Sequence, residues 1–264
     1  MKKVVSTISF ILFSSLSIAG GDFCVTNNFS FQPGERITFK VFYSVIGIYI
    51  DAGTANFNIT RELYNSKPVY HVVADGYSNP RYDWIFKVRD RYESYMDTAT
   101  LLPLRFVRNV NEGGYKKQEN VTFDHQAGKA SSTNGVFNVP GCIQDVISAV
   151  YQARNINYAK YKPGDKIPFS MFLDDKVYNI YIRYMGTEEV RTKFGRFQAI
   201  KLKPMLIKGN AFSGGEKMTL WVSNDWNHIP LRIESPISVG SVKVDMMGYS
   251  NLRHPLNALL KDPN

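Results

Sequence analysis

The chain carries an internal repeat, and this repeat constrains its fold more than any other feature. The segment Pro33–Phe39 (PGERITF) returns as Pro163–Phe169 (PGDKIPF), 130 residues later (163 − 33). The segment Leu102–Phe106 (LPLRF) returns as Ile229–Ile233 (IPLRI), with its proline 127 residues later (230 − 103). Each copy must meet the same demands of backbone geometry and burial, so such a repeat describes an architecture of two related units. It does not indicate a reaction.

Within both copies, apolar and polar residues alternate with period two, which is typical of half-buried antiparallel strands. In the first strand, Ile37, Phe39 and Val41 are expected on one face. We predict an all-β antiparallel fold, in which two related meanders of about six strands each form a curved sheet system, a barrel or a sandwich. The strands are predicted at 36–43, 55–62, 69–74, 88–97, 104–111, 116–124, 166–172, 178–185, 198–206, 218–223, 231–235 and 241–249.

The segment between the two copies has a different periodicity. Apolar residues at helical spacing are Ile143, Val146, Ile147, Val150 and Tyr151. They predict an α-helix over 143–155 that packs on the sheets. The alternative, a helix on a membrane surface, is disfavoured because the polar face carries no lysine. The predicted parts of the chain are a signal peptide (1–20), a first β-meander (21–139), a helical connection (140–162), a second β-meander (163–252) and a C-terminal tail (253–264).

The N-terminus resembles a secretory signal peptide. Two lysines follow Met1, an apolar run covers 4–18, and small residues follow it, which predicts cleavage after Ala19 or Gly20. A membrane anchor is the alternative, but serines and a threonine interrupt the run, which is shorter than the ~20 residues that span a bilayer. Lipidation at Cys24 is disfavoured because Phe23 stands where a small residue is required. We expect no transmembrane segment in the mature chain.

The chain is basic, with a formal net charge of +9. Cleavage would remove Lys2 and Lys3 and leave +7 (9 − 2). The basic residues are dispersed, which favours a solvated basic surface; an anionic membrane or a polyanionic glycan is the alternative partner. Nucleic acid is a poor partner for an exported protein.

Two cysteines remain in the mature chain, Cys24 and Cys142. An oxidising compartment allows them to pair, and a bridge would close a loop of 118 residues (142 − 24). In the chain-entropy model such a loop contributes ~4–5 kcal/mol to stability. Two unpaired thiols, one of them a nucleophile, are the alternative.

No catalytic signature occurs in the sequence. The four histidines, at 71, 125, 228 and 254, lack the spacing that aligns zinc ligands, and there is no nucleophile elbow or phosphate-binding loop. The adjacent pair Asp174–Asp175 is predicted to form a tight turn. We therefore expect no catalytic residue, no metal and no cofactor.

Two sets of residues are candidates for ligand binding. Asp83 and Asp90, with Tyr82 and Trp84 near them, are predicted to line a sugar-binding groove. Ion pairing of these carboxylates with neighbouring arginines is the alternative.

The second set consists of the repeat-related arginines, Arg105 and Arg232. Each should project from the strand face opposite its apolar neighbours. They are anion ligands if the sheets enclose a cavity, and ordinary surface residues if that face meets solvent.

Several segments resemble the exported bacterial family called domain of unknown function 3108. They are Val88–Tyr92, Leu102–Arg108, Cys142–Tyr151 and Trp221–Asp225. The resemblance covers nearly the whole mature chain; it implies export in a Gram-negative cell and carries over no catalytic residues. The layout of a strand, a short turn and a Pro-Leu-Arg strand also resembles the periplasmic carriers of the Lol type, whose curved sheets hold acyl chains. Here the unit occurs twice.

These observations favour a non-enzymatic envelope binding or transport-accessory protein for a lipid-like or glycan ligand, in the periplasm or envelope of a Gram-negative bacterium. An exported glycan hydrolase that uses carboxylates such as Asp83 and Asp90 is one alternative. A structural partner of an outer-membrane assembly is the other.

Overall fold

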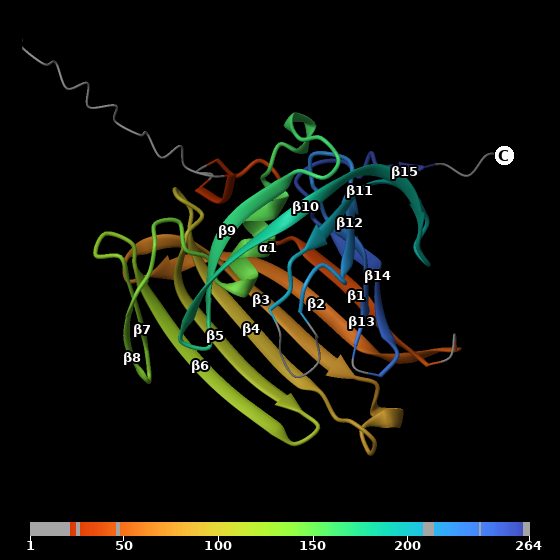
Figure 1. Cartoon of the computed structure of the whole chain (residues 1–264), viewed down its shortest axis with the longest axis horizontal. Helices are drawn as coiled ribbons and strands as arrows, with labels where there is room; N and C mark the ends of the chain where they lie inside the picture. Colours follow the sequence, from red (N-terminus) through yellow and green to blue (C-terminus); the bar gives the residue numbers. More distant parts are fainter. Residues whose placement is uncertain (1–21, 25–26, 46–47, 208–213, 238, 261–264) are drawn as a thin grey trace, which may run out of the picture.

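The computed structural model describes residues 22–24, 27–45, 48–207, 214–237 and 239–260. The predicted signal peptide (1–20) lies outside the described residues. The described residues form one antiparallel sheet of 15 strands with one α-helix (Figure 1). The predicted all-β class, with one interposed helix, is confirmed.

The strands follow the chain as two meanders. The first contains β1 (Arg36–Val45), β2 (Ile48–Tyr64), β3 (Lys67–Ser78), β4 (Arg89–Asp97), β5 (Pro103–Glu112), β6 (Tyr115–Asp124), β7 (Lys129–Ser132) and β8 (Gly135–Asn138). The second contains β9 (Lys166–Leu173), β10 (Lys176–Arg191), β11 (Arg196–Pro204), β12 (Thr219–Ser223), β13 (Pro230–Pro236), β14 (Ser241–Ser250) and β15 (Leu259–Leu260).

The two meanders join edge to edge. The order across the sheet runs from β8 back to β1, then from β14 back to β9, and β1 pairs with β14 along nearly its whole length. The repeated words occupy matching places: Gly34 precedes β1 and Gly164 precedes β9, with φ of 87° and 101°. The Pro-Leu-Arg words begin β5 and β13. The repeat therefore corresponds to strands of the same rank in each meander.

The two ends of the sheet meet through side chains rather than strand pairing. Asp174, in the turn after β9, accepts from Arg108 of β5 at 2.5 Å, and its backbone N–H donates to Glu119 of β6 at 3.1 Å. Asp174 and Asp175 have φ of 51° and 59°, as in the tight turn predicted for them. The sheet is thus curled and barrel-like but not closed.

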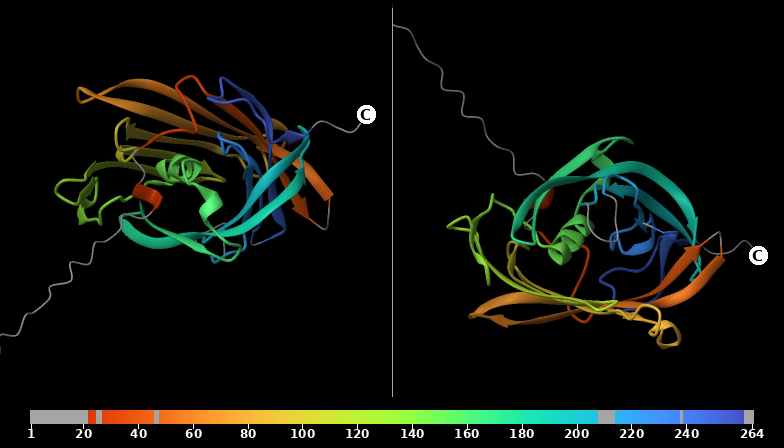
Figure 2. Two further views of the ribbon diagram at one scale, coloured as in Figure 1. Left: turned by 90° about the horizontal axis from the view of Figure 1, so that it is seen from above. Right: turned by 60° about the horizontal axis from the view of Figure 1, so that its bottom comes forward.

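The helix α1 (Val146–Arg154) lies on the concave side of the curled sheet (Figure 2). It is shorter than the predicted helix (143–155), because Asp145 is its N-cap and Asn155 its C-cap. The Asp145 carboxylate accepts from the backbone N–H groups of Ile147 and Ser148, both at 2.7 Å, and from the Ser94 hydroxyl of β4 at 2.6 Å. This cap fixes the start of the helix against the first meander.

The helix fills the space between the meanders. One side packs with the first meander in an apolar cluster that includes Tyr151. The Tyr151 ring lies edge-on to the Phe31 ring, with 4.9 Å between the ring centroids. The other side packs against β9–β12 through Ala149. A third cluster joins β1, β2 and β14 to β11–β13. The interior is therefore built as a packed core.

An ion pair at the C-terminal end of α1 is almost fully buried. The Arg154 guanidinium donates to both Glu35 oxygens, at 2.5 and 2.8 Å, and the two side chains are 2% and 1% exposed. Arg154 also donates to the carbonyls of Asn227 at 3.0 Å and Ser30 at 3.3 Å. One side chain thereby connects the helix to the residues before β1 and to the β12–β13 turn.

A disulfide joins Cys24 to Cys142, with 5.3 Å between their Cα atoms. It ties the short helix η1 (Asp22–Cys24) to the segment just before α1. The neighbouring Phe23 ring stacks on Phe169 of β9 at 4.1 Å. The predicted bridge is confirmed, and the alternative of two free thiols is wrong.

Replacing Arg154 by Met should lower the free energy of unfolding by about 3–5 kcal/mol, because it leaves the Glu35 carboxylate buried without its partner. Urea unfolding of the disulfide-bonded protein measures this loss. Arg61→Met, at an exposed position of β2, is the matched control and should change stability little. Equal losses for the two variants would contradict the role given to the buried pair.

Candidate functional site

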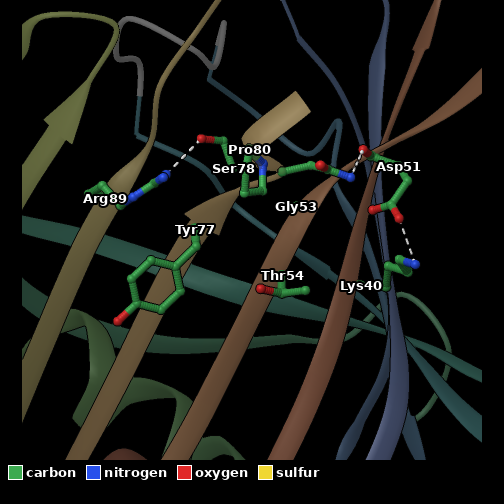
Figure 3. Close-up of a pocket in the computed structure, with 9 residues that line it drawn as sticks. Lys40, Asp51, Gly53, Thr54, Tyr77, Ser78, Pro80 and Arg89 are labelled. Atoms are coloured by element: carbon green, nitrogen blue, oxygen red, sulfur yellow. Dashed lines mark hydrogen bonds and ion pairs between the residues drawn. The ribbon is translucent and has the colours of Figure 1, made fainter. Parts of the chain in front are cut away.

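A depression of about 450 Å³ lies over β1–β4, on the sheet face opposite α1 (Figure 3). The face follows from alternation, since Phe57 and Ile59 of β2 pack toward α1 and Thr54 projects the other way. The lining residues are Lys40, Asp51, Gly53, Thr54, Tyr77, Ser78, Asn79, Pro80 and Arg89. We call this depression the Tyr77 pocket.

Strand register assembles the pocket. Lys40 of β1 lies opposite Thr54 of β2, Thr54 opposite Tyr77 of β3, and Tyr77 opposite Arg89 of β4. Residues directly opposite in an antiparallel pair share a face and lie side by side. The result is a row of four side chains across four strands: an ammonium, a hydroxyl, a phenol ring and a guanidinium.

The charges of the pocket are paired. Lys40 Nζ lies 2.6 Å from Asp51 Oδ2, and Arg89 Nη2 lies 2.6 Å from Asp83 Oδ2. Ser78 donates to Asp83 as well, at 2.5 Å. Hydrogen bonds from Ser78 and Arg89 hold the pKa of the Asp83 carboxyl below its usual range. The pocket therefore offers several polar groups with little net charge.

The wall of the pocket is formed by the 3₁₀ helix η2 (Pro80–Tyr82). Asn79 is its N-cap and accepts from the Arg81 N–H at 3.1 Å, and Pro80 starts the helix. The Asn79 backbone N–H donates to the Ala52 carbonyl of β2 at 2.7 Å. The cap and the proline thus fold the connection between β3 and β4 locally. The hydrogen bond from Asn79 to β2 holds this connection beside the pocket.

Three predicted residues lie at the end of η2 or just after it, next to the pocket but not in its lining. Asp83 turns inward to Arg89, Tyr82 is half-buried, and Trp84 projects into solvent with 83% of its surface exposed. Asp90 does not join them, because it follows Arg89 on β4 and projects to the opposite face. There it accepts from the Asn111 N–H at 2.9 Å. Asp83 and Asp90 therefore do not share a groove.

Asp90 instead contacts a second carboxyl group. Burial, together with the hydrogen bond to Asp90, raises the pKa of Glu112 to about 7. The two acids lie on the inner face at the ends of β4 and β5. The protonated form of Glu112 is thereby favoured, and in that form its carboxyl can donate a hydrogen bond to Asp90.

The repeat-related arginines occupy different surroundings. Arg105 donates to Asn120 at 3.0 Å and lies over the Tyr95 ring, 5.5 Å from its centroid. Arg232 makes two hydrogen bonds to the buried Asp245 carboxylate, at 2.6 and 2.9 Å. Neither lines the Tyr77 pocket.

The sequence did not point to Lys40, Asp51 or Tyr77. Alternation assigns residues to a face but not to a register, and β1 and β2 also shift register between Val41 and Phe42. A register shift leaves no residue signature here. No local signal would have placed Lys40 next to Asp51.

Within the described ranges, no three His, Cys, Asp or Glu side chains gather as metal ligands would. In the same part of the chain, no helix combines the length and the apolar character needed to cross a bilayer.

The family model for the protein of unknown function DUF3108 matches residues 36–247, which span both meanders and α1. The chain belongs to the DUF3108 family. The resemblance inferred from its sequence segments is confirmed. No curated protein matches this DUF3108 chain.

One solved structure supports the fold of this DUF3108 protein. A β-barrel-like protein of the family DUF1849 from Brucella abortus aligns with a TM-score of 0.55 and 11% identity, over 85% of this chain and 100% of the other. A protein with a YmcC-like fold from Bacteroides fragilis aligns with a TM-score of 0.35 and 14% identity, over 86% and 100%. The alignment with the DUF1849 protein supports the fold alone, because the identity is only 11%. The alignment with the YmcC-like protein supports no argument, because its TM-score is below 0.5.

The raised pKa of Glu112 predicts a pH effect on stability. Folding favours the protonated carboxyl, so its contribution is full below its usual pKa of 4.5 and is lost as the pH rises to about 7. The stability of the wild type relative to Glu112→Gln should therefore fall across this window, by on the order of 1 kcal/mol because the group is only half-buried. Urea unfolding from pH 4 to 8 tests this. Glu189→Gln, at an exposed position, should leave the profile unchanged; a parallel wild-type and Glu112→Gln profile would rule the shift out.

Proposed function

We propose that this DUF3108 protein is a non-enzymatic binding protein of the bacterial envelope, and that it holds a glycan in the Tyr77 pocket. The row formed by Lys40, Thr54, Tyr77 and Arg89 carries this proposal. The Tyr77 ring is 43% exposed, so a sugar face can pack on it. The surrounding ammonium, hydroxyl and guanidinium groups suit sugar hydroxyls and carboxylates.

Packing favours a glycan over an acyl chain. A carrier of acyl chains needs an apolar cavity. Here α1 occupies the concave side of the sheet, and Phe31, Phe106 and Tyr151 pack there with at most 2% exposure. The Tyr77 pocket, in contrast, is polar and open to solvent. A lipid-like ligand would therefore bind through its head group.

The carboxylates support binding better than hydrolysis. Asp83 is held by Ser78 and Arg89, and Asp90 projects to the other face of β4. Asp90 and Glu112 share a hydrogen bond, which brings them closer than the ~5–10 Å that separates glycosidase carboxyls. These placements favour binding over hydrolysis.

The disulfide supports an extracytoplasmic location, since such bonds persist in oxidising compartments. With the signal peptide predicted from the sequence, it fits the periplasm or envelope of a Gram-negative bacterium.

Binding to an array of bacterial envelope glycans tests the proposal. The wild type should bind at least one glycan, and Tyr77→Ala should weaken that binding about tenfold, because the aromatic contact is lost. Tyr249→Ala, which removes a ring of similar exposure (40%) on β14, should bind as the wild type does. Equal binding by wild type and Tyr77→Ala would exclude the pocket. Mass spectrometry of organic extracts of the purified protein detects a lipid instead.

A further inference from the structure

One end of the sheet carries large apolar side chains exposed to solvent. Ile48 and Tyr49 begin β2 with 69% and 52% of their surface exposed. Trp84, Ile85 and Phe86 follow η2 with 83%, 62% and 54% exposed. We call these five residues the apolar rim. Solvent exposure of such side chains is unfavourable, and clusters of them mark surfaces that bind a partner.

The two parts of the apolar rim lie at the same end of the sheet. The Asn79 N–H, at the start of η2, donates to the Ala52 carbonyl near the start of β2. The Asn79 side chain also donates to the Asp51 carbonyl at 3.3 Å. Figure 1 shows η2 (gold) at the lower edge and the start of β2 (orange) at the right-hand edge, both away from α1. The rim is therefore formed at one end of the sheet by two segments, the start of β2 and the residues that follow η2.

Basic side chains surround the rim. Arg81 precedes and Lys87 follows the Trp84 loop (residues 83–86), and both are exposed. Lys243 lies over the Tyr49 ring, with Nζ 4.5 Å from its centroid. The nearby acids are neutralised, since Asp83 pairs with Arg89 and Asp51 pairs with Lys40. The apolar centre thus has a positively charged margin.

We propose that the apolar rim docks onto an anionic lipid bilayer. Trp and Tyr side chains are favoured at the boundary between head groups and acyl chains, where an amphipathic ring meets both environments. The aliphatic tips add buried apolar area, and the basic margin adds attraction to anionic head groups. The rim side chains project into solvent at the end of the sheet, which suits insertion into a deformable surface.

Docking at the rim would place the Tyr77 pocket beside the membrane. Asp51, Asn79 and Pro80 line that pocket; Asp51 follows Tyr49 closely on β2, and Asn79 and Pro80 start the connection that leads to Trp84. The pocket would then face glycans that extend from the bilayer surface. The docking proposal does not depend on glycan binding, because its residues are outside the pocket lining.

Vesicle co-sedimentation of the full mature, disulfide-bonded protein tests docking. Vesicles of phosphatidylethanolamine and phosphatidylglycerol are compared with vesicles of phosphatidylcholine alone. We expect binding to the anionic vesicles that weakens with salt. The double variant Trp84→Ser/Ile85→Ser should bind at least about tenfold more weakly, because the inserted side chains are lost.

A matched control is available at the opposite end of the sheet. Trp226, in the β12–β13 turn, is 66% exposed, and Leu63, at the far end of β2, is 72% exposed. The variant Trp226→Ser/Leu63→Ser removes a similar apolar area and should bind as the wild type does. Thermal unfolding should show that both double variants fold.

Three results would overturn docking. One is no binding of the wild type to anionic vesicles at low salt, and another is an equal loss in the rim and control variants. The third is unchanged vesicle binding by the rim variant together with loss of a co-purifying envelope protein, which would assign the rim to a protein partner. Tyr77→Ala should keep vesicle binding, so failure of docking and failure of glycan binding are separate results.

Discussion

The buried ion pair between Arg154 and Glu35 is the interaction on which the arrangement of the two meanders depends. Removing a guanidinium and a carboxylate from water is costly, and the cost is offset only when every charged atom finds a partner. Arg154 finds partners in Glu35, Ser30 and Asn227, which lie before β1 and in the β12–β13 turn. Any sliding or rotation of α1 would separate these charges. The helix can therefore occupy only one position, and both meanders are built around it.

This helix also determines where a ligand can bind. The curled sheet resembles a barrel, and an empty barrel of this size would offer its interior to a ligand. Here the ends of the sheet meet through side chains such as Arg108 and Asp174, and α1 with its aromatic neighbours fills the concave side. Polar chemistry is displaced to the outer face and to the loop ends. The Tyr77 pocket and the apolar rim both lie there.

Much of the fold could be predicted from the sequence, because alternation and repetition are local signals. The alternation that contains Ile37 and Phe39 correctly predicts that both are buried. It fails at Val41, which is half-buried, because β1 and β2 shift register between Val41 and Phe42. The repeat predicted the strands of the second meander. The hairpin β7–β8 escaped prediction because strands of four residues are too short to show a period. The candidate site was predicted only where it is local: Tyr82, Asp83 and Trp84 lie together, whereas Lys40 and Tyr77 required register. Asp90 lies apart from Asp83 because the two neighbours Arg89 and Asp90 project to opposite faces of β4, and Asp83 pairs with Arg89.

The repeat finally separates scaffold from function. Strands of equal rank in the two meanders meet the same packing demand, and their shared words, Pro-Gly and Pro-Leu-Arg, lie at turns and strand starts. At the offset of 127 residues, the connection between β3 and β4 corresponds to the one between β11 and β12. Only the first carries Asn79-Pro80, which caps and starts η2, and the Trp84 loop that follows. The scaffold shared by the two meanders therefore does not account for η2 and the exposed aromatic residues near it. Binding is the constraint that best explains exposed apolar side chains beside paired polar groups.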